Sequence, residues 1–233
     1  MFLLFIPYSY NIFIVSDQIH LYKREVKSVA EVAPGVFVLA YHRNFSFSSG
    51  QVVAVDLVPN GRPRLYSIAS GVNDNEIEIL FDLRAEGHLT PKLAKLRPSD
   101  IIWVSEPFGN YRTLPGKGYW IAAGTGVAPF VSMARSGLTS SKTLIHGGRT
   151  DEHFYFSNIF ERSLGSRYIR CCSQQEDTAH FKGRLTEWLK SATDLDLNAR
   201  FFLCGSAEMV VQVRDILIAK GVPFKNITSE TYF

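Results

Sequence analysis

Four consecutive residues place a fixed cation, an aromatic ring and a hydroxyl on one predicted strand. They are Arg64, Leu65, Tyr66 and Ser67, at the start of an alternating stretch that ends at Ser70. Successive strand side chains point to opposite faces, so Arg64 and Tyr66 share one face. An arginine can grip a phosphate through two donors, and a tyrosine ring offers a stacking surface. The set suits a flavin dinucleotide, but taken alone an ordinary sheet strand is the simpler interpretation.

A second group is typical of an anion-binding turn. Gly87, His88 and Leu89 lead into Thr90, which begins a short helix predicted over residues 90–96. Thr90 is a favoured N-cap residue, and the proline after it suits the first helical position. A helix start offers unpaired N–H groups and a positive dipole end, and Gly87 allows a phosphate to approach closely. A plain loop-to-helix turn is the alternative, and for His88 a solvated loop histidine.

A third group joins a strand to a helix through glycines. Residues 119–123 predict a buried strand, followed directly by Gly124, Thr125 and Gly126 and then by a helix start at residues 127–130. A strand, a glycine-rich turn and a helix form the layout of a nucleotide-binding βα unit. Only two glycines of the dinucleotide fingerprint are present, so the motif alone is weak.

Two kinds of sheet must position these groups. Pro, Gly and Asn punctuate short predicted strands at residues 35–42, 51–57, 64–70, 76–83 and 101–104, which indicates an antiparallel barrel or sandwich. After residue 118, predicted strands at 119–123, 142–146, 167–171 and 200–204 alternate with helices at 152–164, 183–191 and 207–220. Such alternation favours a parallel sheet with helices on both faces. We therefore predict a two-domain α+β protein: an extension over residues 1–18, an antiparallel β-barrel domain over 19–115 and an α/β domain over 116–233.

Composition excludes several classes of function. The chain of 233 residues has a net charge of only +3 and no run of Lys and Arg, so nucleic acid is not an expected partner. Its three cysteines, Cys171, Cys172 and Cys204, form no C-x-x-C pair, which predicts no metal site and favours a reducing, cytoplasmic compartment. Residues 1–16 are uncharged but short for a membrane span, and no integral membrane segment is expected.

Taken together, three motifs resemble those of the ferredoxin–NADP reductase family. They are Arg64-Leu-Tyr-Ser67, Gly124-Thr-Gly-Val-Ala-Pro129 and Cys204-Gly205 followed by Met209, and the similarity extends from Tyr22 to Phe233. Within the family the chain looks most like the bacterial ferredoxin/flavodoxin reductases, to which residues 87–93, 104–109 and 228–233 are similar. The resemblance implies an FAD-binding barrel domain and an NAD(P)-binding domain.

The resemblance also implies roles for residues on the flavin side. Arg64 would hold the flavin pyrophosphate, Tyr66 would stack on the isoalloxazine ring, and Ser67 would bond near flavin N5. Leu89 and Thr90 would contact the pyrophosphate, while the aromatic tail would cover the flavin. The implied FAD-binding residues are Arg64, Leu65, Tyr66, Ser67, Gly87, His88, Leu89, Thr90, Thr125, Tyr232 and Phe233.

On the nicotinamide side, the resemblance implies Gly124, Thr125, Gly126, Arg149, Arg184, Cys204, Gly205 and Met209 as NADP-binding residues. Arg149 and Arg184 match the family's cations for the 2′-phosphate. A third family position, usually Ser-Arg, reads Ser173-Gln174 here, so NADP is favoured while NAD stays open. Ser67, Cys204 and Glu230 would line the hydride-transfer pocket as catalytic residues. For Cys204 the alternative is a buried cysteine at a strand end.

The expected function is that of an FAD-dependent oxidoreductase. It would transfer electrons between NADP(H) and a one-electron carrier, ferredoxin or flavodoxin, by hydride transfer at flavin N5. Proximity of the two rings would supply most of the catalysis, because hydride transfer is the cofactors' own chemistry. One alternative is an NAD(P)H-dependent flavin reductase or oxygenase reductase component, and another is a nucleotide-binding interaction module without turnover.

Overall fold

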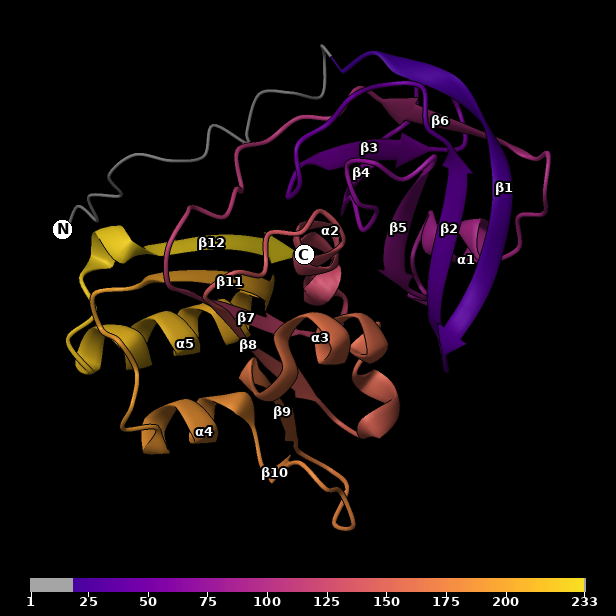
Figure 1. The fold of residues 1–233 in the computed structure, drawn as a ribbon. Coiled ribbons are helices and arrows are strands. Elements are labelled where there is room, and N and C mark those ends of the chain that lie inside the picture. Colours follow the sequence, from indigo (N-terminus) through magenta and orange to yellow (C-terminus); the bar gives the residue numbers. More distant parts are fainter. Residues whose placement is uncertain (1–18, 233) are drawn as a thin grey trace, which may run out of the picture.

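Two β-sheets of six strands each are formed within residues 19–232, the part of the chain that the structure, a computed structural model, describes. Residues up to Ser105 form the first sheet, and residues from Gly118 onward form the second (Figure 1). The predicted extension over residues 1–18 and the terminal Phe233 lie outside the described residues.

The first sheet is antiparallel and its two edges meet. Its strands follow the order β4-β3-β6-β1-β2-β5, with every neighbouring pair antiparallel. A bridge between Ile68 and Ile79 connects the chain just after β4 to β5. The sheet is therefore a small barrel, as predicted, and closure protects its edges. The strands are β1 Leu21–Ala33, β2 Val36–His42, β3 Val52–Asp56, β4 Arg64–Ser67, β5 Glu76–Asp82 and β6 Ile101–Ser105.

Alternating side chains fill the barrel. Along β5, Ile77, Ile79 and Phe81 are buried, and Ile77 and Ile79 are completely buried. Each such side chain contributes about 1.5–3 kcal/mol by leaving water. The helix α1, Thr90–Leu93, adds the fully buried Leu93 to the same core. The barrel thus holds β4 and the turn before α1 against one apolar cluster.

The predicted capping of α1 is wrong. Leu89 occupies the N-cap position and makes no side-chain capping bond, while Thr90 is already the first helical residue. The Thr90 hydroxyl instead accepts a 2.9 Å hydrogen bond from the backbone N–H of Arg84. Leu89 is buried among the barrel's apolar side chains, and this packing decides where the helix begins. The helix also ends at Leu93, three residues earlier than expected.

The second sheet is parallel and follows the order β10-β9-β8-β7-β11-β12. Its strands are β7 Gly118–Ala123, β8 Lys142–Gly148, β9 Tyr168–Cys172, β10 Phe181–Lys182, β11 Arg200–Ser206 and β12 Ile227–Tyr232. The helices are α2 Ala128–Arg135, α3 Ser157–Leu164, α4 Leu185–Ser191 and α5 Ala207–Ala219, with short 3-10 turns η1 Gly124–Val127, η2 Asp151–His153, η3 Gly165–Arg167 and η4 Phe224–Asn226.

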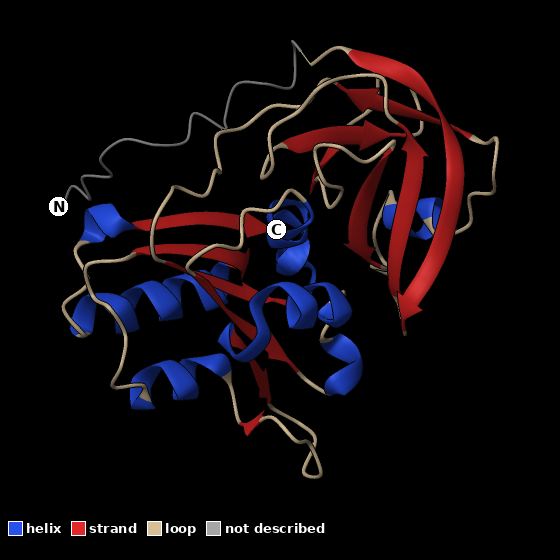
Figure 2. Cartoon of the chain, viewed as in Figure 1, coloured by secondary structure: helices blue, strands red, loops and turns tan. Residues whose placement is uncertain are grey.

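Helices cover both faces of this sheet (Figure 2). Trp120 and Phe202 face α2, α3 and part of the barrel, in one buried cluster. Ile121 and Leu203, the next residues along β7 and β11, face α4 and α5 in another cluster. Alternation along strands buried on both sides produces this arrangement. Because the first cluster includes Leu80 of the barrel, the two sheets share a core.

The order of strands reverses beside β7. From β7 the chain adds β8, β9 and β10 on one side, and it then returns to add β11 and β12 on the other. The connections that leave β7 and β11 therefore diverge, and a crevice opens at the carboxyl ends of these strands. Gly124 follows β7 directly, and Gly205 lies near the end of β11. The tertiary fold thus brings two of the predicted motifs to one place.

A buried lysine fixes the segment that connects the two sheets. Lys142 at the start of β8 is 2% exposed. Its Nζ donates to the carbonyl oxygens of Leu114, at 2.7 Å, and Gly116. Burial lowers the pKa of Lys142, while the two carbonyls satisfy its donors. The connection is therefore tied to the second sheet.

The helix predicted over residues 152–164 is interrupted. The chain forms η2, then a non-helical stretch, and α3 begins only at Ser157. Phe156 adopts a left-handed conformation with φ 57°, which stops a continuous helix. Phe154 and Tyr155 in this stretch are each 5% exposed. Burial of these two rings outweighs the local preference for a longer helix.

Candidate functional site

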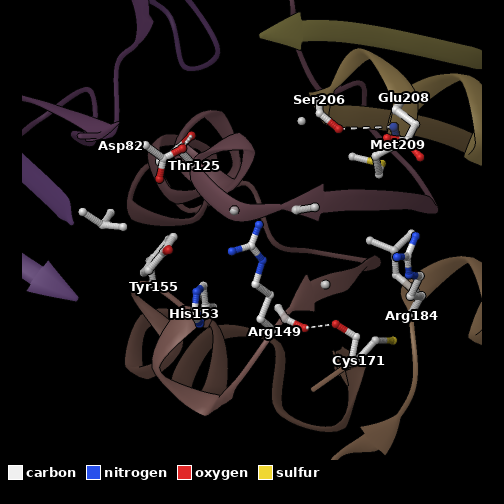
Figure 3. Close-up of a pocket in the computed structure, with 18 of the residues that line it drawn as sticks. Asp82, Thr125, Arg149, His153, Tyr155, Cys171, Arg184, Ser206, Glu208 and Met209 are labelled. Carbon is white, nitrogen blue, oxygen red and sulfur yellow. Dashed lines mark hydrogen bonds between the residues drawn. The ribbon is translucent and has the colours of Figure 1, made fainter. Parts of the chain in front are cut away.

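A cavity of about 560 Å³ lies between the two sheets, at the carboxyl ends of β7 and β11. The barrel side contributes the loop between β1 and β2 and the residues at and after the end of β5. The parallel sheet contributes residues that follow its strands (Figure 3). Six of the predicted NADP-binding residues line this cavity: Gly124, Thr125, Arg149, Arg184, Gly205 and Met209.

Two arginines from separate loops give the cavity a positive region. Arg149 follows β8, and Figure 3 shows its side chain reaching into the cavity. Arg184 occupies the N-cap position of α4, where its backbone N–H donates to the Glu187 carboxylate at 2.7 Å. Two guanidinium groups facing one space suit a phosphate, because each presents paired donors. Glu208 lines the same cavity and supplies a negative charge on its α5 side.

Glycines shape the floor beside β7. Gly124 has φ +57°, a conformation that favours glycine, and nothing lies within 4 Å of where a Cβ would stand. A ligand can therefore approach this backbone closely. At Gly126 a Cβ would stand 2.3 Å from the Cys204 carbonyl oxygen, so η1 packs directly on β11. Gly126 and the fully buried Cys204 support the cavity floor from below.

The three predicted catalytic residues meet across the two sheets. Ser67 Oγ donates to Glu230 Oε2 at 3.1 Å, although 163 positions separate them in the chain. Cys204 on β11 is the register partner of Glu230 on β12. Burial raises the pKa of the Glu230 carboxyl to about 7, and the bond from Ser67 opposes this rise. The pair can therefore hold or pass a proton near neutral pH.

The other residues of the flavin motif lie along an edge of the barrel. Arg64 and Leu65 are exposed, and Tyr66 is half-buried with its ring edge-to-face against Phe81, 6.2 Å between centroids. Burial raises the pKa of the Tyr66 phenol to about 12, against the opposing effect of Arg64. The phenol thus stays protonated, and the arginine faces solvent where a phosphate could reach it. The cavity described above is not lined by this motif.

The predicted anion-binding turn at residues 87–90 packs on the same barrel core. Leu89 is buried and His88 is exposed at the turn before α1. At Gly87 a Cβ would stand 2.8 Å from the Arg84 carbonyl oxygen, so the turn is tight there. Both Tyr66 and Leu89 contact the barrel cluster, so the two groups pack against a single core. The roles of these residues in binding FAD stay predictions.

Sequence reasoning missed the barrel wall of the cavity. Asp82 and Arg84 line it at the end of β5, and Tyr155 lines it before α3. Thr125 Oγ1 donates to Asp82 Oδ2 at 3.3 Å, so the two sheets touch at the predicted nicotinamide position. Burial and the Asp82 charge raise the pKa of Tyr155 to about 12, while Arg149 opposes this. Charged residues ending a strand were the available signal, but their partner is distant in sequence.

The remaining predictions concern the aromatic tail, the third phosphate position, a membrane segment and a metal site. The backbone of Tyr232 ends β12 in register with Ser206, whereas its side chain and Phe233 lie outside the described residues. Ser173 lines the cavity, and the Gln174 backbone N–H donates to the Arg149 carbonyl oxygen at 2.8 Å. Within residues 19–232, no helix is long and apolar enough to cross a membrane, and no cluster of His, Cys, Asp and Glu suits a metal ion.

Known proteins resemble this chain along most of its length. The family described as oxidoreductase NAD-binding domain matches residues 120–215. A ferredoxin–NADP reductase of Azotobacter vinelandii is 31% identical over 206 residues, covering 76% of this chain and 80% of that protein. A probable dihydroorotate dehydrogenase B (NAD(+)) electron transfer subunit of Pyrococcus abyssi is 26% identical over 193 residues, covering 82% and 72%. The crystal structure of a ferredoxin NADP+ reductase from Neisseria gonorrhoeae with bound FAD and NADP has the same fold, with a TM-score of 0.81 at 21% identity, covering 92% of this chain and 99% of that one.

Proposed function

We propose that this chain is an FAD-containing reductase that takes electrons from NADPH and passes them to ferredoxin or flavodoxin. The chain belongs to the ferredoxin–NADP reductase family. Transfer of electrons from a nicotinamide nucleotide is the activity common to its relatives. One observation carries the proposal. The cavity at the strand-order reversal joins two arginines and an open glycine turn, and the partly buried Ser67–Glu230 pair lies beside its floor.

The residues present fit both nucleotides. Gly124 leaves open space above the backbone, and Arg149 and Arg184 would hold phosphates of NADP(H) in the cavity. The exposed guanidinium of Arg64 and the tight turn at Gly87 would hold the FAD pyrophosphate. When bound, FAD supplies the exchange between two-electron and one-electron transfer that the protein's side chains cannot perform.

The protein's own groups position and protonate. Ser67 Oγ is held by Glu230 Oε2, so its orientation is set before any ligand arrives. A carboxyl with a pKa of about 7 is partly protonated at neutral pH, and it can replace a proton that Ser67 gives up. Tyr66 offers an apolar ring at the barrel edge, and Cys204 lies between Glu230 and the η1 turn.

The charge of the cavity supports NADPH rather than NADH as the electron donor. Arg149 and Arg184 both line the cavity, and an additional phosphate would contact guanidinium donors there. Gln174 stands where the family usually has arginine and carries no charge, and its backbone N–H bonds to the Arg149 carbonyl oxygen. The similarity to an electron transfer subunit named for NAD(+) supports a second candidate, a reductase that uses NADH and serves a partner subunit.

Reduction kinetics test the proposal. The purified protein should be yellow, and anaerobic NADPH should bleach its flavin absorbance. Its reduced flavin should then be reoxidised by ferredoxin or flavodoxin with saturation. A protein that purifies without flavin, and that binds none when FAD is added, would refute the proposal. Faster reduction by NADH than by NADPH would favour the second candidate, and reoxidation that saturates only with free flavin would indicate a flavin reductase.

A further inference from the structure

A carboxylate from the barrel reaches the first turn of the nucleotide-binding sheet. Asp82 ends β5, and its Oδ2 accepts a 3.3 Å hydrogen bond from Thr125 Oγ1. Both residues line the cavity, and Figure 3 shows their side chains directed toward each other. Asp82 is one-third exposed, so its carboxylate faces the cavity as well as the threonine.

The backbone beside Thr125 is closely packed against the parallel sheet. Gly126 packs so closely on β11 that a Cβ there would stand 2.3 Å from the Cys204 carbonyl oxygen. A β-branched side chain has few χ1 conformations. With the neighbouring backbone closely packed, the hydrogen bond to Asp82 therefore favours one χ1 rotamer of Thr125.

The direction of this hydrogen bond decides what else Thr125 can bind. A hydroxyl has one hydrogen, and here that hydrogen is donated to Asp82. The lone pairs of Thr125 Oγ1 remain as acceptors, and an acceptor at this position suits an amide N–H. The nicotinamide ring carries a carboxamide, whose NH2 group is such a donor.

Asp82 is also tied to the flavin side of the barrel. The Arg84 guanidinium lies 3.6 Å from the same Asp82 oxygen. The Arg84 backbone N–H donates to Thr90 Oγ1 at 2.9 Å, in the turn expected to hold the FAD pyrophosphate. Contacts through Asp82 and Arg84 therefore connect Thr125 to Thr90, in the turn predicted to hold the FAD pyrophosphate.

We infer that Asp82 is a positioning residue that makes the Thr125 hydroxyl a hydrogen-bond acceptor for the carboxamide of the nicotinamide nucleotide. The inference rests on the proposed function. It concerns the nicotinamide half of the nucleotide only, because Arg149 and Arg184 lie on other loops of the cavity. Asp82 itself touches the threonine rather than the reacting atoms.

Flavin-loaded Asp82→Ala, Asp82→Asn and Glu76→Ala variants test this. Glu76 lies on the same strand and pairs with Lys27 instead, so it is the matched control. Stopped-flow reduction is measured with NADPH and with its 3-acetylpyridine analogue, which lacks the amide N–H. Asp82→Ala should lower the NADPH rate about fivefold, the effect of losing one hydrogen bond, and leave the analogue rate nearly unchanged. Asp82→Asn keeps an acceptor oxygen and should restore the NADPH rate to within about twofold of the unmodified protein.

Binding provides a second measurement that needs no turnover. By calorimetry, Asp82→Ala should weaken NADP+ but not 2′-phospho-ADP-ribose, which is NADP+ without its nicotinamide. Equal loss for both ligands, or an unchanged ratio of the two reduction rates, would show that Asp82 only joins the sheets. If the unmodified protein prefers NADH, the corresponding NADH ligands replace these. Failure of the unmodified protein to be reduced by either nucleotide would refute the proposed function itself, a result distinct from an unchanged ratio.

Discussion

Replacing Glu230 by glutamine should remove a pH dependence from the stability of this protein. Burial raises the pKa of the Glu230 carboxyl from 4.5 to about 7 in the folded chain. Between these values the folded protein holds a proton that the unfolded chain has released, so the contribution of Glu230 to stability falls as the pH rises. Below about pH 4.5 the contribution is complete, and above about pH 7 it is lost. Glutamine keeps a side-chain oxygen that can accept the hydrogen bond from Ser67, but it does not titrate.

The magnitude follows from the size of the pKa change. Each factor of ten in proton affinity is worth about 1.4 kcal/mol, so a rise from 4.5 to about 7 corresponds to roughly 3 kcal/mol. This value is an upper limit, because Glu230 is only partly buried and solvent screens its charge. We expect the free energy of unfolding of the unmodified protein, relative to that of Glu230→Gln, to fall by about 1–3 kcal/mol between pH 4.5 and pH 7.5.

Urea unfolding at several pH values measures this difference. The protein is first stripped of bound nucleotides, because ligand binding would add its own pH dependence. Tryptophan fluorescence follows both parts of the chain, since Trp103 lies in the barrel and Trp120 in the parallel sheet. Glu25→Gln, which removes an exposed carboxylate of β1, is the control. If the free energy of unfolding of the unmodified protein, relative to that of Glu230→Gln, stays constant or rises across this range, the assignment of a raised pKa to Glu230 is refuted.

Three further substitutions test the nucleotide sites and the packing beneath them. Arg64→Ala should weaken flavin retention about tenfold through loss of a charge-assisted hydrogen bond, measured as flavin per protein after dialysis. Arg62→Ala, which changes an exposed neighbour, is the control. Unchanged flavin content in Arg64→Ala would exclude Arg64 as the phosphate anchor. Arg149→Ala should raise the KM for NADPH about tenfold more than the KM for NADH, and equal effects would mean that Arg149 does not contact the 2′-phosphate. Gly126→Ala should lower the free energy of unfolding by about 1–3 kcal/mol, because its Cβ would stand 2.3 Å from the Cys204 carbonyl oxygen; an unchanged Tm by circular dichroism would contradict this packing.

Much of the fold was predictable because it depends on spacing within short stretches. Alternation of apolar residues in stretches such as 76–82 predicts strands, and the change of period after Gly118 predicts the parallel sheet with its helices. The turn at Gly124 was predictable for the same reason, since its backbone needs the conformational freedom of glycine locally. Helix boundaries were less accurate. The break at Phe156 and the N-cap at Leu89 both arise where burial of aromatic or aliphatic side chains outweighs a local preference.

In the candidate site, the difference between what local patterns predict and what distant contacts decide is larger. The family resemblance implied Ser67, Cys204 and Glu230 as one set, but no local pattern predicts that Ser67 and Glu230 are hydrogen-bonded or that burial raises the pKa of Glu230. Asp82 carried no motif at all, and its contact with Thr125 spans 43 positions.

Short stretches of sequence were enough to predict the local backbone: which stretches form strands, where glycine turns lie, and which strand ends carry charged side chains. The tertiary structure alone decided the order of strands, the closure of the barrel between Ile68 and Ile79, and the reversal beside β7 that opens the cavity. The physical reason is that backbone preference acts over a few neighbouring residues, whereas burial depends on which apolar faces meet. Those faces come from distant parts of the chain, and the properties of the site follow from their meeting.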